Sequence, residues 1–260
     1  MNDNSIISQQ PHIDSFRSAV KYYFLRPLAK IVPVSIIPSS LFRSKDVPED
    51  KDINHDNWQN YLLEQFDREG FEILEVGSRV VTGSHFGQSF KHAHYTGFDY
   101  YSGENVDVAG DAHSLSSYFG DKRFDLIFSS AVFEHLAMPW KVSLEIIKLL
   151  KVGGFVFIET HYSFNSHERP WHFFQFSENA LNVLFPEKFG IECVKKGCSN
   201  LLKCCYSSKA SRYLRGIPVR GMYCHSEFLG RKIRETDHLS WDNVSTDDAA
   251  NGTKYPAPSK

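Results

Sequence analysis

Between residues 71 and 161, apolar runs of strand length alternate with stretches of helical pattern. The strand-like runs are FEILEVG, YTGFD, NVDVAGD, FDLIFSS and GGFVFIETH, at 71–77, 95–99, 105–111, 124–130 and 153–161. Strands that alternate with helices predict a largely parallel, Rossmann-like sheet covered by helices on both faces. In such a sheet, ligands bind at the carboxyl ends of the strands.

The segment MPWKVSLEIIKLLKVGG, at 138–154, is typical of an amphipathic helix. Its apolar residues near one helical face are Val142, Ile146, Leu149 and Leu150. The glycines Gly153 and Gly154 predict the end of this helix. Ser177 is the expected N-cap of a further helix in SENALNVLF.

The chain divides into three parts by composition. Residues 1–52 form a helical N-terminal arm that ends in the charged linker RSKDVPEDKD. Residues 53–230 form the catalytic or binding core. Residues 231–260 are polar and rich in turn formers, which predicts a disordered C-terminal tail.

Composition excludes several classes of protein. The formal net charge is -2 and the pI about 6.6, so no nucleic-acid partner is expected. Five irregularly spaced cysteines and no secretory signal favour free thiols in a reducing cytoplasm, and the alternative is a zinc site that these cysteines form with His225, which follows Cys224. The apolar run 31–42 contains two prolines and is too short to span a bilayer, so no transmembrane helix is predicted. The basic, aromatic stretch 16–30 either packs on its own domain or makes peripheral membrane contact.

Acidic residues stand at the ends of successive predicted strands. Glu75 closes the first, and Asp99 closes the second 24 positions later. A carboxylate at the tip of the second strand can accept hydrogen bonds from the two hydroxyls of a ribose. The alternative is that Asp99 only caps the next turn. Asp111 follows the third strand and can accept from an adenine amino group.

Two stretches, GFDYYSGENVDVAGDAHSL and FDLIFSSAVFEHLAMPWKVSLEIIKLLKVGGFVFIETH, make the chain resemble the class I S-adenosylmethionine-dependent methyltransferases, and within them the type 11 group. The resemblance covers about residues 71–197. It implies a seven-stranded sheet, S-adenosylmethionine as cofactor, and an antiparallel hairpin beginning with FGIECVKKG at 189. The residues that it assigns to cofactor binding are Glu75, Gly77 and Ser78 for the amino acid end, Asp99 and Tyr100 for the ribose, Asp111, Ala112 and His113 for the adenine, and Ser129 and Ser130 for the pocket floor.

The loop after the first strand departs from the family pattern. An acid-x-G-x-G-x-G sequence is common there, whereas this chain has E-V-G-S-R-V-V-T-G, with Arg79 at the second glycine position. Glycines allow positive φ and close backbone approach. We expect an intact site with a variant loop, and the alternative is the relic of a site.

Histidines cluster where the fold predicts the acceptor. His135 follows the fourth strand, His161 follows the fifth, and His167 and His172 lie in SHERPWHFFQFS. His135, His161 and His172 are the candidate catalytic bases, and the alternative is that these side chains are structural. The aromatic residues that offer a stacking wall are Trp171, Phe173 and Phe174. No metal site is predicted, because nothing near Glu168 fixes a ligand geometry.

The sequence therefore favours a cytoplasmic methyltransferase that acts on an oxygen, or less readily a nitrogen, of a small or medium polar acceptor such as a saccharide. One alternative is an inactive scaffold module that docks through residues 16–43. Another is a nicotinamide-dependent oxidoreductase, which the absence of G-x-G-x-x-G disfavours. The sequence does not predict an oligomeric state.

Overall fold

The computed structural model describes residues 33–81, 83 and 85–255. It divides the chain into two compact units. Within the described residues, one comprises 45–200 with 223–255, and the other comprises 33–44 with 201–222. The larger unit contains the main sheet and its helices.

A seven-stranded sheet forms the centre of the larger unit, and it confirms the predicted fold class. Its order is β3-β2-β1-β4-β5-β9-β6. Strands β1 to β5 pair in parallel, and β9 runs antiparallel to β5. The strands are β1 Glu72–Val76, β2 His94–Asp99, β3 Val108–Ala109, β4 Phe124–Ser130, β5 Leu150–His161, β6 Ile191–Leu201 and β9 Tyr223–Lys232.

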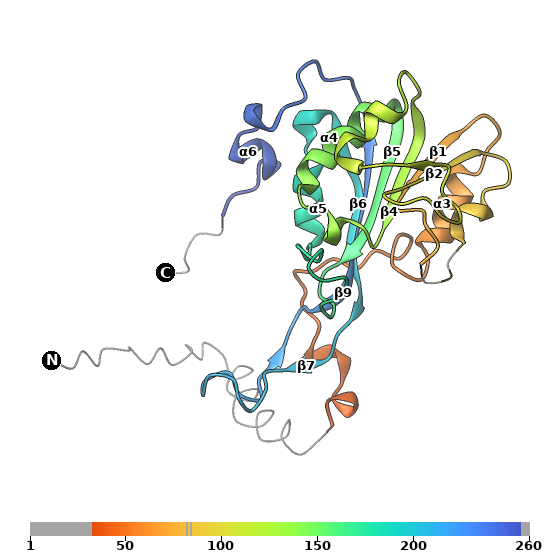
Figure 1. Cartoon of the computed structure of the whole chain (residues 1–260). Coiled ribbons are helices and arrows are strands. Elements are labelled where there is room, and N and C mark those ends of the chain that lie inside the picture. The colour runs from red at the N-terminus through yellow and green to blue at the C-terminus, as the bar shows by residue number, and fades with distance from the viewer. Residues whose placement is uncertain (1–32, 82, 84, 256–260) are drawn as a thin grey trace. The chain divides into compact units, whose positions relative to one another are not determined.

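Helices cover both faces of this sheet, with α4 and α5 on one face and α3 on the other (Figure 1). The α-helices are α3 Trp58–Phe66, α4 Pro139–Leu149, α5 Glu178–Leu184 and α6 Thr246–Ala249. The short 3-10 helices are η2 Val34–Ile36, η3 Ser39–Leu41, η4 Phe86–Ser89, η5 Ala112–Tyr118, η6 Phe133–His135, η7 Glu187–Phe189 and η8 Trp241–Asn243.

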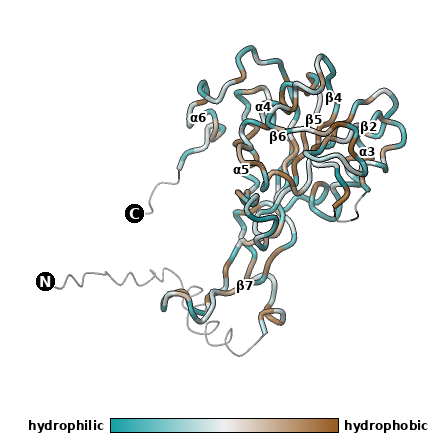
Figure 2. Tube along the Cα trace, in the orientation of Figure 1, coloured by the Kyte–Doolittle hydropathy of each residue, from teal (hydrophilic) through white to brown (hydrophobic). Residues whose placement is uncertain are grey.

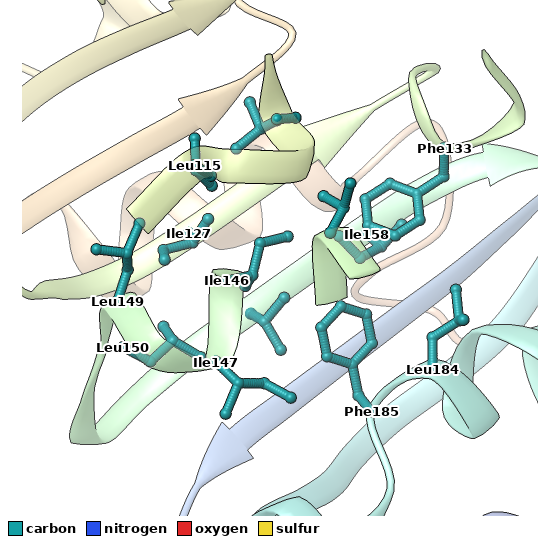
Figure 3. Close-up of a cluster of buried hydrophobic side chains, with 14 of the residues drawn as sticks. Leu115, Ile127, Phe133, Ile146, Ile147, Leu149, Leu150, Ile158, Leu184 and Phe185 are labelled. Carbon is teal, nitrogen blue, oxygen red and sulfur yellow. The ribbon is translucent and has the colours of Figure 1, made fainter. Parts of the chain in front are cut away.

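Two hydrophobic layers hold the sheet in place. On the α4 and α5 face, Ile127 and Ile158 of the sheet pack among Ile146 and Phe185 (Figure 3). On the α3 face, Trp58 packs among aromatic rings of the strands and of η4. Figure 2 shows hydrophobic residues concentrated along the central strands. Burial of apolar area stabilises a fold by about 25 cal/mol per Å². These two layers therefore hold the strands in place relative to one another, and with them the edge at which the strands end.

Helix α4 ends earlier than predicted. It stops at Leu149, and Leu150 already pairs with Phe124 as part of β5. The cause is Lys232, which is buried and donates from Nζ to the carbonyls of Ile147 at 3.0 Å and Leu150 at 2.9 Å. A cation at a helix C-terminus satisfies carbonyls that lack a partner. The predicted N-cap of α5 is confirmed, since the Ser177 hydroxyl accepts from the amide of Ala180.

In place of the hairpin predicted after residue 189, strand β6 has as its sheet neighbour a strand that is far apart in sequence. Strand β6 begins at Ile191, and its sheet neighbour β9 begins at Tyr223. Residues 202–222 between them belong to the smaller unit, where β7 Cys204–Cys205 pairs with β8 Pro218–Val219. Within that unit, Lys203 Nζ donates to the carbonyl of Ile37 at 2.8 Å.

The expectation of a disordered tail from residue 231 does not hold for the residues up to 249. Strand β9 continues to Lys232, and η8 and α6 follow. Trp241 packs edge-on against Phe189, and its indole N–H donates to the carbonyl of Trp140 at 2.6 Å. A few apolar side chains in a polar segment are therefore enough to anchor it to the core.

The helical arm predicted at residues 1–32, with its membrane-contact stretch, lies outside the described residues. Among the residues that are described, no helix is long and apolar enough to cross a membrane. The domain boundaries at 52 and 230 stay predictions.

Candidate active site

The carboxyl ends of the parallel strands bring most of the predicted residues to one edge of the sheet. Glu75 pairs in register with Gly97 of β2 and with Phe128 of β4. Asp99 ends β2, and Ser130 and His161 end β4 and β5. Because neighbouring strands end together, these side chains line one continuous rim.

The turn after β1 requires its first glycine. Gly77 has φ +92°, and a Cβ there would lie 2.1 Å from Cγ2 of Val132. The amides of Gly77 and Ser78 both donate to the carbonyl of Phe98. Ser78 is buried, and its hydroxyl oxygen has no hydrogen-bond partner among the described residues. The turn therefore keeps the sharp glycine geometry of a cofactor loop although its later glycines are absent.

Arg79 lies over Asp99. Its Nε donates to Oδ1 of Asp99 at 3.3 Å, and its amide donates to Oδ2 at 3.3 Å. The guanidinium also lies 6.0 Å from the ring centre of Tyr101, whose amide donates to Oδ1 of Asp99 at 3.1 Å. A carboxylate accepts about four hydrogen bonds, so these three leave roughly one acceptor position free.

A polar network supports the turn from beneath. Tyr95 donates its hydroxyl to Glu75, and Asn105 donates from Nδ2 to the Tyr95 oxygen at 2.8 Å and to the carbonyl of Ser78 at 2.9 Å. Burial raises the pKa of Glu75 to about 7, although the hydrogen bond from Tyr95 favours the ionised carboxylate and acts in the opposite direction. The hydrogen bond from Tyr95 orients this carboxyl, and its contact with the amino acid end of the cofactor stays a prediction.

Asp111 and His113 form a second pair on the rim. Asp111 is exposed, and its Oδ1 accepts from both the amide and Nδ1 of His113, the latter at 2.6 Å. Burial opposes ionisation of Asp111, but these two bonds hold its pKa below the ordinary value. Nε2 of His113 accepts from the amide of Met138. Both ring nitrogens of His113 are therefore engaged in hydrogen bonds within the protein.

The predicted serines of the pocket floor have separate places. Ser129 is fully buried and donates to the carbonyl of Val76 at 2.8 Å, which ties β4 to β1. Ser130 donates to Oε2 of Glu159 at 2.6 Å. The exposed ring of Tyr100 makes an edge contact with Tyr101. Of these three, only Ser130 and Tyr100 have side chains on the rim.

The predicted histidines gather beside a carboxylate that sequence reasoning missed. We call the side chains of Glu134, His135, His161, His167 and His172 the histidine cluster. Glu134 lies in η6 after β4, and His167 and His172 lie in residues 162–176 after β5, which we call the acceptor loop. The rings of His167 lie 4.8 Å from His135, 5.2 Å from His161 and 4.7 Å from His172 between centroids.

Glu134 organises this cluster from inside the protein. Its side chain is 0% exposed, and Thr160 donates to its Oε2 at 2.5 Å. Burial raises the carboxyl pKa, but His161 and Thr160 outweigh this and hold it below the ordinary value. Its backbone carbonyl accepts from the amides of Phe173 and Phe174 and so anchors the acceptor loop.

A second group, which we call the His55 cluster, comprises His55, Ser130, Glu159 and His225. His55 Nδ1 lies 2.5 Å from Oε1 of Glu159, and the rings of His55 and His225 stack at 3.9 Å. The bond to Glu159 raises the pKa of His55, whereas burial lowers that of His225 to about 4. His55 did not stand out in sequence because it lies far from the strand motifs, and His225 was noted only as the neighbour of Cys224. The only local signal was the acid in IETH.

Part of the chain is similar in sequence to a known protein family. The profile of a family described as methyltransferase domain matches residues 81–158. No curated protein matches.

Three solved structures with a similar fold are distant in sequence. An S-adenosylmethionine-dependent methyltransferase from Archaeoglobus fulgidus is 15% identical, with a TM-score of 0.50 over 67% of this chain and 93% of that one. The YcgJ protein of Bacillus subtilis is 18% identical, with a TM-score of 0.47 over 69% of this chain and 98% of that one. A Haloferax volcanii complex of the Trm112 methyltransferase activator and a methyltransferase contains a chain that is 17% identical, with a TM-score of 0.47 over 70% of this chain and 91% of that one.

The family match lies across β2 to β5, where the strand ends carry the rim residues, and the Archaeoglobus structure shares the fold around it. Residues 81–158 therefore match a methyltransferase domain family, and the larger unit has a fold similar to that of a solved S-adenosylmethionine-dependent methyltransferase.

Proposed function

We propose that this domain transfers a methyl group to a hydroxyl oxygen of a small or medium polar acceptor, such as a saccharide. The acceptor would be held by the histidine cluster and by the aromatic residues of the acceptor loop. The observation that carries the proposal is the chemistry beyond β4 and β5. Four histidines and a buried carboxylate stand there beside exposed aromatic rings.

The cofactor side supports this proposal residue by residue. When bound, S-adenosylmethionine supplies a methyl group on a sulfonium. The turn at Gly77 would hold its amino acid end, since the close approach to Val132 leaves no room for a side chain. Asp99 would accept from the ribose through its free acceptor position. Ala112 and His113 would contact the adenine, with Asp111 accepting from its amino group.

The acceptor side has the character of a binding wall for a polar ring. Trp171, Phe173 and Phe164 are 55%, 44% and 43% exposed although all three lie in a short loop. Large aromatic rings seldom remain so exposed together without a partner. Aromatic faces bind apolar sides of ring-shaped molecules, and the adjoining imidazoles offer hydrogen bonds to hydroxyls.

Removal of the acceptor proton requires an available lone pair. His172 is the weakest of the three candidate bases, because its Nδ1 already accepts from the amide of His167 at 3.2 Å. His135 and His161 direct ring nitrogens into the cluster. Since positive charge on the donor is lost during transfer, placement of the acceptor against the methyl group contributes most of the rate.

The test is a methyl-transfer screen with radiolabelled S-adenosylmethionine and the full chain, against saccharides and matched primary amines. We expect label on hydroxyl acceptors. We expect Trp171→Ala to raise KM for the acceptor without changing the Kd for S-adenosylhomocysteine, and the exposed Tyr213→Ala of the other unit to change neither. Transfer to amines alone, or none to any acceptor by protein that binds the cofactor, would overturn the proposal.

A further inference from the structure

We propose that Glu134, His135, His161 and His167 form a binding site for a divalent transition-metal ion. Side-chain atoms of Glu134, His161 and His167 all lie within 4.8 Å of one another. Nδ1 of His161 is 2.7 Å from Oε1 of Glu134. Nε2 of His135 is 3.1 Å from Nε2 of His167 and 3.9 Å from the same carboxylate oxygen.

We call these four residues the quartet. Hydrogen bonds from the quartet to residues outside it set the histidine tautomers that a metal ion requires. Nδ1 of His135 lies 2.6 Å from the carbonyl of Trp171, and Nδ1 of His167 lies 2.9 Å from the carbonyl of Asn165. A carbonyl only accepts, so each Nδ1 carries the proton. In the neutral rings, each Nε2 therefore presents a lone pair. Metal-binding histidines are typically oriented by such a bond from the other ring nitrogen.

These lone pairs face each other, because the two Nε2 atoms are 3.1 Å apart. Two unprotonated Nε2 atoms at 3.1 Å repel each other, whereas a cation beside both would be bound by both. An extra proton on one ring would also relieve the repulsion. Titration with zinc distinguishes a bound metal ion from a protonated imidazole.

The buried part of the quartet has the same feature. Oε1 of Glu134 and Nδ1 of His161 are both buried and, within the described residues, neither has a hydrogen-bond partner, although they lie 2.7 Å apart. Within those residues, the ion-pair contacts of the Glu134 carboxylate are to His135 and His161, with no lysine or arginine. A buried carboxylate without a fixed cation is costly. A metal ion would satisfy both atoms and balance the charge.

The His55 cluster does not have this arrangement. His55 already makes a hydrogen bond to Glu159, and the other carboxylate oxygen accepts from Ser130. Asn200 donates to Nδ1 of His225 at 3.1 Å. The ligand atoms of His55, Glu159 and His225 also lie within 4.8 Å of one another, but the hydrogen bonds to Ser130 and Asn200 already engage Glu159 and His225. Its polar groups are satisfied without an ion.

Three imidazole nitrogens and one carboxylate oxygen suit zinc or a neighbouring first-row divalent ion better than magnesium or calcium. His167 belongs to the acceptor loop, while Glu134 and His135 belong to η6. The ion would therefore fix the loop to the end of β4. Direct contact of the ion with an acceptor oxygen would be a further role, and that role rests on the proposed function.

The experiment is calorimetric titration of untagged, chelator-treated full chain with zinc chloride, followed by thermal unfolding with and without zinc. We expect one ion per chain and a higher Tm in its presence, because an ion that binds only the folded state stabilises it. His167→Ala and His135→Ala lie on half-exposed positions and should each weaken zinc binding at least tenfold. His172→Ala, a histidine of the same cluster outside the quartet, should bind zinc like the wild type.

Three results would overturn the proposal. The first is no zinc binding by the folded wild type, which would indicate that an extra proton on one imidazole, and not a metal ion, relieves the repulsion between the two Nε2 atoms. The second is unchanged affinity in His167→Ala and His135→Ala. The third is loss of binding in His55→Ala, which would transfer the ion to the His55 cluster. None of these readouts uses methyl transfer, so failure of the metal site and failure of the proposed function are distinguishable.

Discussion

Replacing Arg79 by alanine is expected to tighten cofactor binding, although it removes a residue from the cofactor loop. In the structure, Arg79 Nε donates a hydrogen bond to Oδ1 of Asp99. The carboxylate of Asp99 is the group that would accept hydrogen bonds from the ribose. A ribose that makes two bonds to Asp99 must displace this contact. Arg79 therefore competes with the ligand.

The magnitude follows from exposure. The Arg79 side chain is 39% exposed and its Nε to Oδ1 distance is 3.3 Å. An ion pair of this kind contributes about 0–1 kcal/mol. Its removal should therefore lower the Kd for S-adenosylhomocysteine by up to about fivefold. Asp99→Ala removes hydrogen bonds to a charged group worth about 1.5–3 kcal/mol and should raise the Kd by about 10–100-fold.

The assay is a double-mutant cycle by calorimetry. Arg79→Ala should have no effect in the Asp99→Ala background, because the competing contact no longer exists. Arg68→Ala, whose guanidinium lies over the ring of Phe71, serves as the matched control and should leave Kd unchanged. If Arg79→Ala weakens binding tenfold or more in the wild-type background, Arg79 holds the ligand and the reasoning is refuted.

Three further predictions concern stability. Gly77→Ala combines a left-handed backbone with a Cβ 2.1 Å from Val132 and should lower the free energy of unfolding by at least about 1–3 kcal/mol in urea titration; an unchanged midpoint would contradict the turn geometry. Lys232→Met leaves the carbonyls at the end of α4 without their donor and should cost about 3 kcal/mol by the same titration, and a loss below experimental error would show that the cap is dispensable. Burial raises the pKa of Glu227 to about 8 from the ordinary 4.5, so the folded state binds the extra proton between these values. The free energy of unfolding should fall as pH rises across that window, by at most about 1.4 kcal/mol per pH unit, and Glu227→Gln should lack this dependence; equal slopes for both proteins would show that Glu227 ionises normally.

Local pattern predicted the strands of the sheet well, because each is a short apolar run that ends in a polar residue. It failed where a distant residue decides the outcome. The end of α4 depends on Lys232, more than 80 positions away along the chain. The partner of β6 was hidden by the intervening residues 202–222, and the tail was misjudged because Trp241 anchors it.

The candidate site was predicted in part for the same reason. The acids and histidines at strand ends were identifiable, since topology alone brings them to one rim. The burial of Glu134 was not, because EHL directs attention to the histidine and a buried carboxylate has no signature in one sequence. The contact of Arg79 with Asp99 joins residues 20 positions apart and could be recognised only as a missing glycine.

The most direct test of the central claim is equilibrium binding of radiolabelled S-adenosylmethionine to the folded full chain, with Asp99→Ala and the exposed Asp121→Ala as a matched pair. We predict one bound cofactor per chain, displaced by S-adenosylhomocysteine, with an affinity that falls about 10–100-fold in Asp99→Ala and is unchanged in Asp121→Ala. Absence of binding by folded wild-type protein, or binding that is indifferent to Asp99, would contradict the assignment of the cofactor to the carboxyl ends of β1 to β4.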